Sequence, residues 1–350
     1  MIRFIYGGFS HSVGFYGVLE GIPFGVKIDE DEINKLLIER QEGIGRSDRQ
    51  KSEKDRIKFL SGVIDGVSVG APLVFCIENK MLDRLGFSVP RPNHADLNGA
   101  IKNGMTSLDA ADGVRDIDFS IISEVSSARS SCIVVAAGAI CIEVLKLLGI
   151  ELEHRVLKIA GIDYEDKDSL TKFIEGLRLL GDTAGGSGEV VVRGLKAGIG
   201  GYALLGDKLD GKLAGAVMSV PSIKGIEIGR GSEFALLLGS ECSDNILLED
   251  GSFKRASNNC GGIEGGVSSG GDIVVRFFIK PPPSVVRGAK SIDFKTGEIA
   301  DLNKLRTDVC AAESVACVAK AVVAIEILKQ ILSQFNSDNI DAFIRGYNNG

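Results

Sequence analysis

Two of the three histidines in this chain lie in turns where proton-transfer chemistry is possible. His11 is in "GGFSHS" and His94 is in "PRPNHAD", each beside polar groups in a segment marked by glycine or proline. Histidine changes charge near neutral pH and therefore serves as a general acid or base. Either residue alone is more readily structural than catalytic, and two such loop histidines strengthen the case for catalysis moderately. The third, His154 in "ELEHRVLKI", has no companions, and we expect it on the surface.

Arginines form the second candidate group. The segment "RQEGIGRSDRQ" carries Arg40, Arg46 and Arg49 around Gly43 and Gly45, although the chain is acidic, with 40 Lys+Arg against 47 Asp+Glu. A guanidinium group binds carboxylate or phosphate through paired hydrogen bonds, and glycine lets the backbone approach a ligand closely. The segment therefore fits an anion site. A solvated charged loop is the alternative, and the charged run "EKDR" that follows favours it when the segment is taken alone.

Arg40 differs from the other arginines because it falls on a predicted helix. Asp29 and Glu32 have the spacing of a capping box, which predicts a helix start. Ile33, Leu37 and Arg40 then share one helical face, which places Arg40 on the inward side. A buried arginine needs an anionic partner, so its position favours a ligand-binding role.

Polar turns precede two apolar segments. In "EVSSARSS" several serines surround Arg129, and in "LRTDVCAAES" a single turn carries Arg306 and Asp308. Free backbone N–H groups at a helix start favour an anion, and an arginine there adds a fixed charge. Simple helix capping is the alternative for both turns. The serines of the first turn are Ser126, Ser127, Ser130 and Ser131.

A glycine-rich segment, "NNCGGIEGGVSSGG" at 258–271, resembles neither a Walker loop nor a dinucleotide fingerprint. No G-K-[ST] follows it, and no strand–GxGxxG–helix pattern is present. It predicts either hairpin turns or a surface against which a flat cofactor lies.

Composition limits the class of protein. The chain has 350 residues, of which 44% are hydrophobic and 25% charged, as is usual for a soluble globular protein. We expect no signal peptide, no membrane span and no nucleic-acid partner, because neither the N-terminal pattern nor a long apolar or basic run is present. Seven cysteines are scattered singly without C-x-x-C, which predicts reduced core residues of a cytoplasmic protein and no metal site.

An internal repeat sets the organisation of the chain. Residues 62–77 align with 262–278, so that three glycines and a Val-Ser pair match at a constant offset. The apolar segments 131–148 and 313–332 correspond in the same way. We therefore expect one domain over 1–350, built from two similar halves at roughly 10–150 and 185–333.

The expected elements in each half are hairpins and buried helices. The two apolar segments predict buried helices flanked by antiparallel sheets, an α+β fold with helices inside and sheets outside. Residues 16–28 predict a hairpin that turns at 23–25. The polar segment 151–185 is expected at the periphery, and 248–259 as a flexible loop.

Taken in order, several of these segments resemble the motifs of the chorismate synthase family over nearly the whole chain. Together their order and spacing are very specific, although no motif is decisive alone. The matching segments are "GFSHS" at 8–12, the arginine and glycine loop at 40–56 with "SGV" at 61–63, "RPNHAD" at 91–96, "VSSARS" at 125–130, "KGIEIG" at 224–229, "NNCGGIEGGVSSG" at 258–270 and "RTD" at 306–308.

The resemblance implies a fold, an activity and a cofactor. Family members have a β-α-β sandwich with an internal duplication and assemble as homotetramers. They convert 5-enolpyruvylshikimate-3-phosphate to chorismate and phosphate by a 1,4-anti elimination in the shikimate pathway. The reaction requires reduced FMN without net redox change, which implies a separate flavin reductase as a partner. The substrate carries a phosphate and two carboxylates, so several arginines are needed to neutralise it.

The resemblance also implies roles for individual residues. His11 is the implied proton donor to the departing phosphate, with Ser10 nearby. His94 lies by the flavin N1/C2 region, and Asp308 lies near flavin N5, where it relays a proton. The implied substrate-binding residues are Arg40, Arg46, Arg49, Arg129 and Arg306. The implied cofactor-binding residues are Ser126, Ser127, Lys280, Arg306, Asn258 and Gly261.

The chain departs from the family motifs at several positions. Retention of His11, His94 and Asp308 nevertheless favours catalysis. Two alternatives remain: a non-catalytic homologue that binds flavin or an anion, and a lyase on the same scaffold with another substrate. The departures are Phe9 and Ser130, where the motifs have glutamate, Ser12 and Asn93, where they have glycine, Val125 in place of arginine and Val309 in place of proline.

Overall fold

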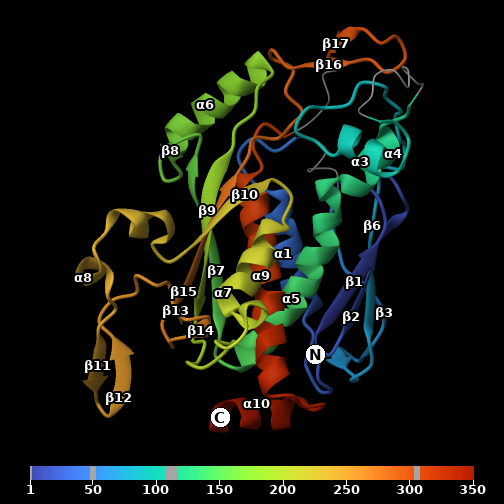
Figure 1. The fold of residues 1–350 in the computed structure, drawn as a ribbon. Helices are drawn as coiled ribbons and strands as arrows, with labels where there is room; N and C mark the ends of the chain where they lie inside the picture. Colours follow the sequence, from blue (N-terminus) through green and yellow to red (C-terminus); the bar gives the residue numbers. More distant parts are fainter. Residues whose placement is uncertain (1, 48–52, 108–116, 303–307) are drawn as a thin grey trace.

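Two antiparallel sheets flank a layer of helices in the computed structural model, which describes residues 2–47, 53–107, 117–302 and 308–350 (Figure 1). The first sheet has the strand order β1-β2-β6-β3 and the second the order β10-β15-β9-β7-β8. The strands of the first sheet are β1 (Arg3–Gly7), β2 (Gly14–Glu20), β6 (Leu73–Glu78) and β3 (Lys58–Ser61). Those of the second are β10 (Ile223–Ile228), β15 (Ile273–Ile279), β9 (Gly186–Arg193), β7 (Glu151–Ile159) and β8 (Ile162–Asp163).

The helical layer is built on two apolar helices that pack closely. Helix α5 (Ser131–Leu147) packs on the first sheet and α9 (Ala312–Gln334) on the second, and the two helices pack on each other. At their crossing a Cβ on Gly138 would lie 2.4 Å from the Cβ of Ala321, so only glycine allows this approach. The expected arrangement, with helices between antiparallel sheets, is confirmed.

Two further helices complete the layer. Helix α1 (Glu30–Gln41) packs on both α5 and α9, and α7 (Leu209–Met218) packs on α9. The carboxylate of Asp29 caps α1 by accepting from the backbone N–H groups of Asp31 and Glu32. The N–H of Asp29 donates to the carboxylate of Glu143 on α5. Glu143 thus takes the acceptor role that a capping box would give to Glu32.

Strand alternation explains which faces of the sheets are buried. In β15, Ile273, Val275 and Phe277 point into the core, while Arg276 faces outward and donates to Glu189. This period of two is the pattern of a sheet with one covered face.

The duplication is visible in how two short hairpins are anchored. The Ser68 hydroxyl accepts from the N–H of Val26 and donates to the Pro23 carbonyl, at 2.9 and 2.6 Å. The Ser268 hydroxyl accepts from the N–H of Ile199 and donates to the Lys196 carbonyl, also at 2.9 and 2.6 Å. These hairpins are β4 (Val63–Ile64) with β5 (Val67–Ser68), and β13 (Ile263–Glu264) with β14 (Val267–Ser268). The internal duplication is therefore structural, and the limits of the repeats at 10–150 and 185–333 stay a prediction.

The hairpin expected over residues 16–28 is wrong. Strand β2 pairs with β1 and β6, and the chain after it does not fold back on β2. Instead Lys27 bridges to Val67, and Phe24 bridges to Asn339. The turn contains Gly25 at φ +92°, and its N–H donates to the Ser68 carbonyl, so it serves to dock the neighbouring hairpin.

Two further expectations need correction. Strand β7 lies inside the second sheet between β9 and β8, so 151–185 is not wholly peripheral; only helix α6 (Lys167–Leu180) lies outside. The expected loop at 248–259 begins with a hairpin of β11 (Ile246–Glu249) and β12 (Ser252–Arg255). Its turn is Asp250-Gly251 with positive φ at both residues, the turn that favours a two-residue hairpin.

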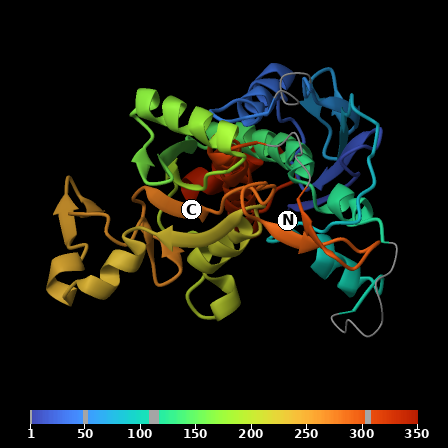
Figure 2. The same cartoon turned by 90° about the horizontal axis from the view of Figure 1, so that it is seen from above.

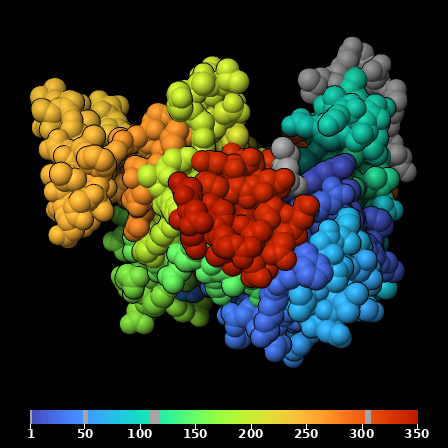
Figure 3. All heavy atoms as spheres, turned by 90° about the horizontal axis from the view of Figure 1, so that it is seen from below, coloured from blue at the N-terminus to red at the C-terminus, as the bar shows by residue number. Residues whose placement is uncertain are grey.

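That hairpin projects from the body of the molecule (Figures 1 and 2). On the face seen from below, the C-terminal helix α10 (Ile340–Asn349) covers the end of the helical layer (Figure 3), where Tyr347 packs edge-on against Phe335. The remaining elements are α3 (Asp96–Lys102), α4 (Ser120–Ser126), η2 (Ala128–Ser130), η3 (Leu205–Asp207), η4 (Gly231–Leu236), α8 (Gly239–Cys242), β16 (Lys290–Ile292) and β17 (Ile299–Asp301).

The sequence expectations about membranes and cysteines can be compared with the structure. The helical run Ser120–Leu147 is long and apolar enough to cross a membrane by length and composition alone, and 67% of its most apolar window is buried inside the protein, as in a core helix. All seven cysteines are free thiols, and five of them are buried as expected. The other two, Cys242 and Cys260, are partly exposed.

Candidate active site

One cavity of about 470 Å³ collects most of the predicted site residues. It lies where the N-terminal ends of α5 and α9 meet the C-terminal end of α1, so three helix termini and several loops form its wall. The predicted residues that line it are Ser10, His11, Arg40, Arg46, His94, Ser127, Arg129 and Asp308. Arg49 and Arg306 lie outside the described residues.

His11 is held by a carboxylate that the sequence did not indicate. Its backbone N–H donates to Glu124 Oε2 at 2.7 Å, and its ring Nδ1 lies 2.6 Å from Glu124 Oε1. The carbonyl of Glu124 also accepts from the N–H of Ser10. With Nδ1 donating to the carboxylate, Nε2 is the ring nitrogen left for the cavity. Phe9, which replaces a motif glutamate, is 45% exposed, and the carboxylate beside His11 comes from α4.

His94 has a similar arrangement with a second carboxylate. Its Nδ1 lies 2.6 Å from Asp96 Oδ1, and Arg91 donates to both oxygens of the same carboxylate. Burial alone would raise the pKa of Asp96, but the hydrogen bonds from His94 and Arg91 lower it to about 2. Asn93, which replaces a motif glycine, keeps the left-handed backbone of this turn at φ +60°, a conformation that asparagine tolerates.

Two buried arginines share one aspartate on the cavity floor. Arg40 Nη2 and Arg129 Nη1 donate to Asp55 Oδ2 at 2.5 and 2.7 Å. Burial raises the pKa of Asp55, and the bond from Arg129 and the charge of Arg40 outweigh it, so the pKa is lowered. Glu53 lies 3.6 Å from Arg129. The anionic partner that a buried Arg40 requires is therefore Asp55 of the same chain.

The same arginines still have donors to offer. Arg40 Nε and Arg129 Nη2 are buried without a hydrogen-bond partner among the described residues. Buried donors are rarely left unsatisfied, and each costs about 1–3 kcal/mol when it is. Because both side chains line the cavity, these donors favour an anionic ligand there.

Arg46 forms a separate ion pair with Asp308 just before the N-terminal end of α9. Its Nη1 lies 2.6 Å from Asp308 Oδ2, and the N–H of Ser47 donates to Asp308 Oδ1 at 2.7 Å. Asp308 does not cap α9, because the helix begins four residues later at Ala312. Burial lowers the pKa of Arg46, and Asp308 opposes that shift.

A second unpredicted carboxylate holds the loop that carries Arg46. Glu313 Oε1, in the first turn of α9, accepts from the N–H of Ile44 at 2.8 Å and from the Tyr164 hydroxyl at 3.0 Å. Gly43 has φ +132°, and a Cβ there would lie 2.8 Å from this carboxylate, so glycine suits this position of the loop.

The predicted cofactor residues do not all converge. Ser127 lines the cavity, with its hydroxyl 3.4 Å from that of Ser10, whereas the Ser126 hydroxyl donates back to the Ile122 carbonyl. The Lys280 amine donates to the carbonyl of Asn93, beside the cavity rim.

Asn258 and Gly261 lie away from the cavity lining. The Asn258 side chain accepts from the N–H of Gly262 and donates to the Asp272 carbonyl, both at 2.7 Å. Its amide is thus used to close the base of the β13–β14 hairpin, and Gly261 forms part of the same turn at φ +62°. This segment is a hairpin base, the first of the two alternatives that the sequence left open.

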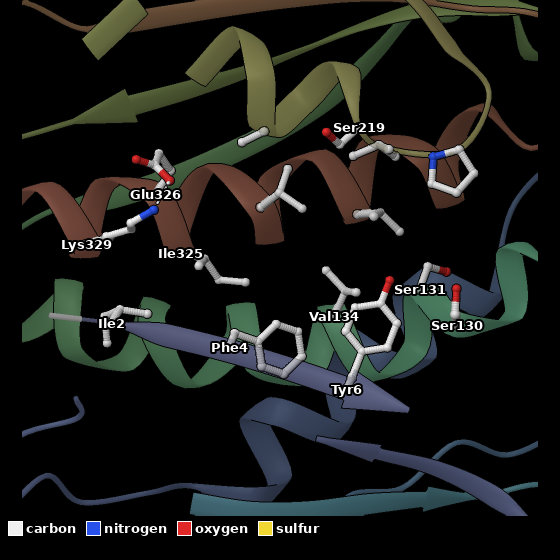
Figure 4. A pocket seen from close by; sticks show the side chains of 15 residues that line it. Ile2, Phe4, Tyr6, Ser130, Ser131, Val134, Ser219, Ile325, Glu326 and Lys329 are labelled. Carbon is white, nitrogen blue, oxygen red and sulfur yellow. Dashed lines mark ion pairs between the residues drawn. The ribbon is translucent and has the colours of Figure 1, made fainter. Parts of the chain in front are cut away.

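A second, mostly apolar cavity of about 360 Å³ adjoins the first. The two share Ser131, Val220, Pro221 and Val318. In Figure 4 the β1 side chains, among them Phe4 and Tyr6, form one wall, and α9 lies across from them.

His154 is not the surface residue that the sequence predicted. It lies on β7 with its side chain 11% exposed, and its Nε2 is 3.4 Å from the carboxylate of Glu39. Burial and the charge of Lys320 lower the pKa of His154 to about 4.

Fold and cavity together place arginines and two carboxylate-bound histidines around one cavity of ligand size. Comparison with known proteins gives the family. The family model described as "Chorismate synthase" matches residues 2–332. The chorismate synthase of Caldanaerobacter subterraneus subsp. tengcongensis is 40% identical over 353 residues, covering 99% of this chain and 97% of that protein. That of Carboxydothermus hydrogenoformans is 36% identical over 387 residues, covering 100% and 98%.

A solved structure agrees with these relatives. The crystal structure of a chorismate synthase superposes with a TM-score of 0.80 at 27% identity, covering 99% of this chain and 96% of that one. The chain belongs to the chorismate synthase family. It is a lyase of the shikimate pathway that forms chorismate, and its family uses reduced flavin.

Proposed function

We propose that the cavity binds 5-enolpyruvylshikimate-3-phosphate beside reduced FMN and eliminates phosphate from the substrate. The C–O bond to phosphate and one C–H bond break, a C=C bond forms, and phosphate and a proton leave, so there is no net redox change. The observation that carries this proposal is the pair of buried arginines, Arg40 and Arg129, that line a cavity of ligand size and each keep one nitrogen without a hydrogen bond.

The chain supplies the neutralising charge from two sides of the cavity. Arg40 and Arg129 are fixed by Asp55 at the floor, and Arg46 by Asp308 at the side. Side chains already held by carboxylates lose little conformational freedom when the ligand binds. Arg49 and Arg306 belong to the same proposed set.

The histidines act as proton-transfer groups, His11 at the departing phosphate and His94 beside the flavin. Glu124 fixes the His11 ring through Nδ1, so that Nε2 can give a proton to the departing phosphate. Asp96 fixes His94 in the same way. Ser10 hydrogen-bonds near the phosphate, and Asp308 accepts and relays a proton.

The cavity also suits a flat cofactor. Apolar side chains on its wall, among them Leu85, Phe87, Pro282 and Val315, give the kind of surface that a ring system covers. A reduced FMN held there would supply an electron transiently and would help to remove the hydrogen. Ser127 on the wall and Lys280 at the rim are the proposed contacts to it, whereas Asn258 and Gly261 shape the scaffold.

The remaining proposals concern the setting of the enzyme. A homotetramer in the cytoplasm, with a separate flavin reductase that supplies reduced FMN, is what the family resemblance supports. The free state of all seven cysteines agrees with a reducing compartment.

Anaerobic turnover tests the proposal. The chain is mixed with the substrate and chemically reduced FMN, and chorismate and phosphate are quantified. We expect equal amounts of the two products, and loss of both in His11→Ala. Tight substrate binding without products in folded protein would instead identify a non-catalytic homologue, and neither binding nor products would indicate another substrate.

A further inference from the structure

Three side chains with metal-binding atoms meet on the side of α1 away from the cavity. Glu39 comes from α1, His154 from β7 and Cys317 from α9, and their ligand atoms all lie within 4.8 Å of one another. None of the three lines the cavity, and the proposed function uses none of them. They are also far apart in sequence, so the fold alone brings them together.

The three donors suit one class of ion. Imidazole nitrogen, thiolate sulfur and carboxylate oxygen are the ligands of Zn²⁺, which takes four of them in a tetrahedron. His154 Nε2 lies 3.4 Å from Glu39 Oε1, too long for a charge-assisted hydrogen bond and close to the separation of two ligands on one zinc ion.

We propose that Glu39, His154 and Cys317 bind one thiophilic divalent cation, such as Zn²⁺, with water as the fourth ligand. The Cys317 thiol gives its proton to solvent as the sulfur–metal bond forms, and nothing is oxidised or reduced. This inference is independent of the proposed function.

Access and charge are compatible with such a site. Glu39 is 50% exposed and opens the cluster to solvent, while His154 and the buried Cys317 close it from behind. Cys317 Sγ donates to the Leu36 carbonyl at 3.5 Å, a weak bond that the metal would replace. Lys320 adds one positive charge nearby, and the thiolate and carboxylate together supply two negative charges.

The position gives the site a structural consequence. The ion would join α1, β7 and α9, and Glu39 is followed directly by Arg40 on the cavity floor. The last turn of α1 would therefore be fixed from behind as well as by Asp55. We expect bound metal to raise the melting temperature of the protein.

Titration with Co²⁺ tests the proposal directly. The reduced full chain, stripped of metal with a chelator, is titrated with Co²⁺ and followed by the thiolate-to-cobalt charge-transfer absorption and tetrahedral visible bands. We expect one equivalent to bind, with release of one proton, and displacement by Zn²⁺. Absence of a charge-transfer band would overturn the proposal.

Variants separate this cluster from the other thiols. Cys317→Ser should abolish the charge-transfer band, and Cys141→Ser, which alters an equally buried thiol on α5, should leave it intact. Glu39 lies on the surface, so the Glu39→Gln variant should fold normally and keeps the test valid if Cys317→Ser does not fold. We expect Glu39→Gln to bind Co²⁺ at least tenfold more weakly than the wild type. A band that survives Cys317→Ser would assign the metal to Cys242 or Cys260 and reject the site.

Discussion

Asp55 and Glu143 are carboxylates at opposite ends of α1, and their environments have opposite effects. Asp55 lies beside Arg40 at the C-terminal end, where burial is outweighed by Arg129 and Arg40 and its pKa is lowered. Glu143 receives the N–H of Asp29 at the N-terminal end, and burial raises its pKa to about 7.

The difference shows that a fixed partner, rather than burial, decides whether a charge is kept inside this fold. At the cavity end, guanidinium groups hold Asp55 ionised, and Asp55 in return holds two arginines in place for a ligand. At the other end Glu143 has a single backbone donor and the more distant Lys146, so it is half neutral near pH 7. The charged side chains that fixed partners hold in place, Arg40, Arg129 and Asp55, therefore lie at the cavity end of α1.

Asp55→Asn should produce the largest effect, because it leaves Arg40 and Arg129 buried without their shared anion. Removing one partner of a buried ion pair typically costs about 3–5 kcal/mol. We expect a loss of this size in the free energy of unfolding, measured by urea denaturation, and weaker substrate binding in any protein that stays folded.

Glu32→Gln is the matched control for Asp55→Asn. Glu32 also pairs with a cation on α1, Lys35, but both side chains are exposed. Exposed pairs contribute little, so this variant should unfold like the wild type. Equal stability of Asp55→Asn and Glu32→Gln would show that the cavity end does not depend on its internal anion.

Arg46→Ala tests the cavity end from the ligand side. Arg46 carries a charge-assisted contact that we assign to the substrate, and its loss should weaken substrate binding by about 1.5–3 kcal/mol. FMN binding should change much less. Isothermal titration of each ligand separately measures both, and equal losses for the two ligands would reject the assignment of Arg46 to the substrate.

Glu124→Gln asks whether a cavity-end carboxylate orients a side chain as well as balancing charge. Glutamine replaces one acceptor oxygen by an NH2 donor, so it can keep both the N–H and the ring Nδ1 of His11 as partners only when the ring proton moves from Nδ1 to Nε2. We expect kcat to fall about 10- to 100-fold with little change in KM, the usual range for loss of an orienting partner. Nitrogen NMR of the His11 ring should show a mixture of tautomers. An unchanged kcat would leave Glu124 with a structural role only.

Much of the fold could be predicted from the sequence, because it depends on local pattern. The apolar runs gave the two central helices, the Asp29 cap gave the start of α1, and helical periodicity placed Arg40 inward. The β11–β12 hairpin was missed although its Asp-Gly turn is a local signal.

The partners of the site residues could not be predicted. Glu124 stands 113 positions from His11, and Asp55 reaches Arg129 across 74 positions, so no spacing rule connects them. His154 was expected on the surface because it has no companions in the sequence, yet α9 packs on its strand and Glu39 of α1 lies 3.4 Å from its ring. Contacts between distant segments depend on tertiary packing, and a sequence pattern reports only the local part of that packing.

Glu143→Gln should give the smallest effect, and its sign follows from the raised pKa. In the window from about pH 4.5 to 7 the folded protein holds a proton on Glu143 that the unfolded chain has lost. Stability from this group is therefore present at low pH and is lost as pH rises through 7. Because Glu143 is only half-buried, we discount the full shift and expect about 1–2 kcal/mol.

The glutamine variant stays neutral at every pH and keeps an oxygen for the N–H of Asp29. We expect it to match the wild type near pH 4 and to exceed it in free energy of unfolding at pH 8, with the difference growing from about pH 4.5 to 7. Urea denaturation of both proteins at these pH values measures the difference in free energy of unfolding. All other groups titrate alike in the two proteins, so their contributions cancel in this difference. A difference that stays constant with pH would mean that Glu143 is ionised like a surface acid, and the contrast between the two ends of α1 would then rest on Asp55 alone.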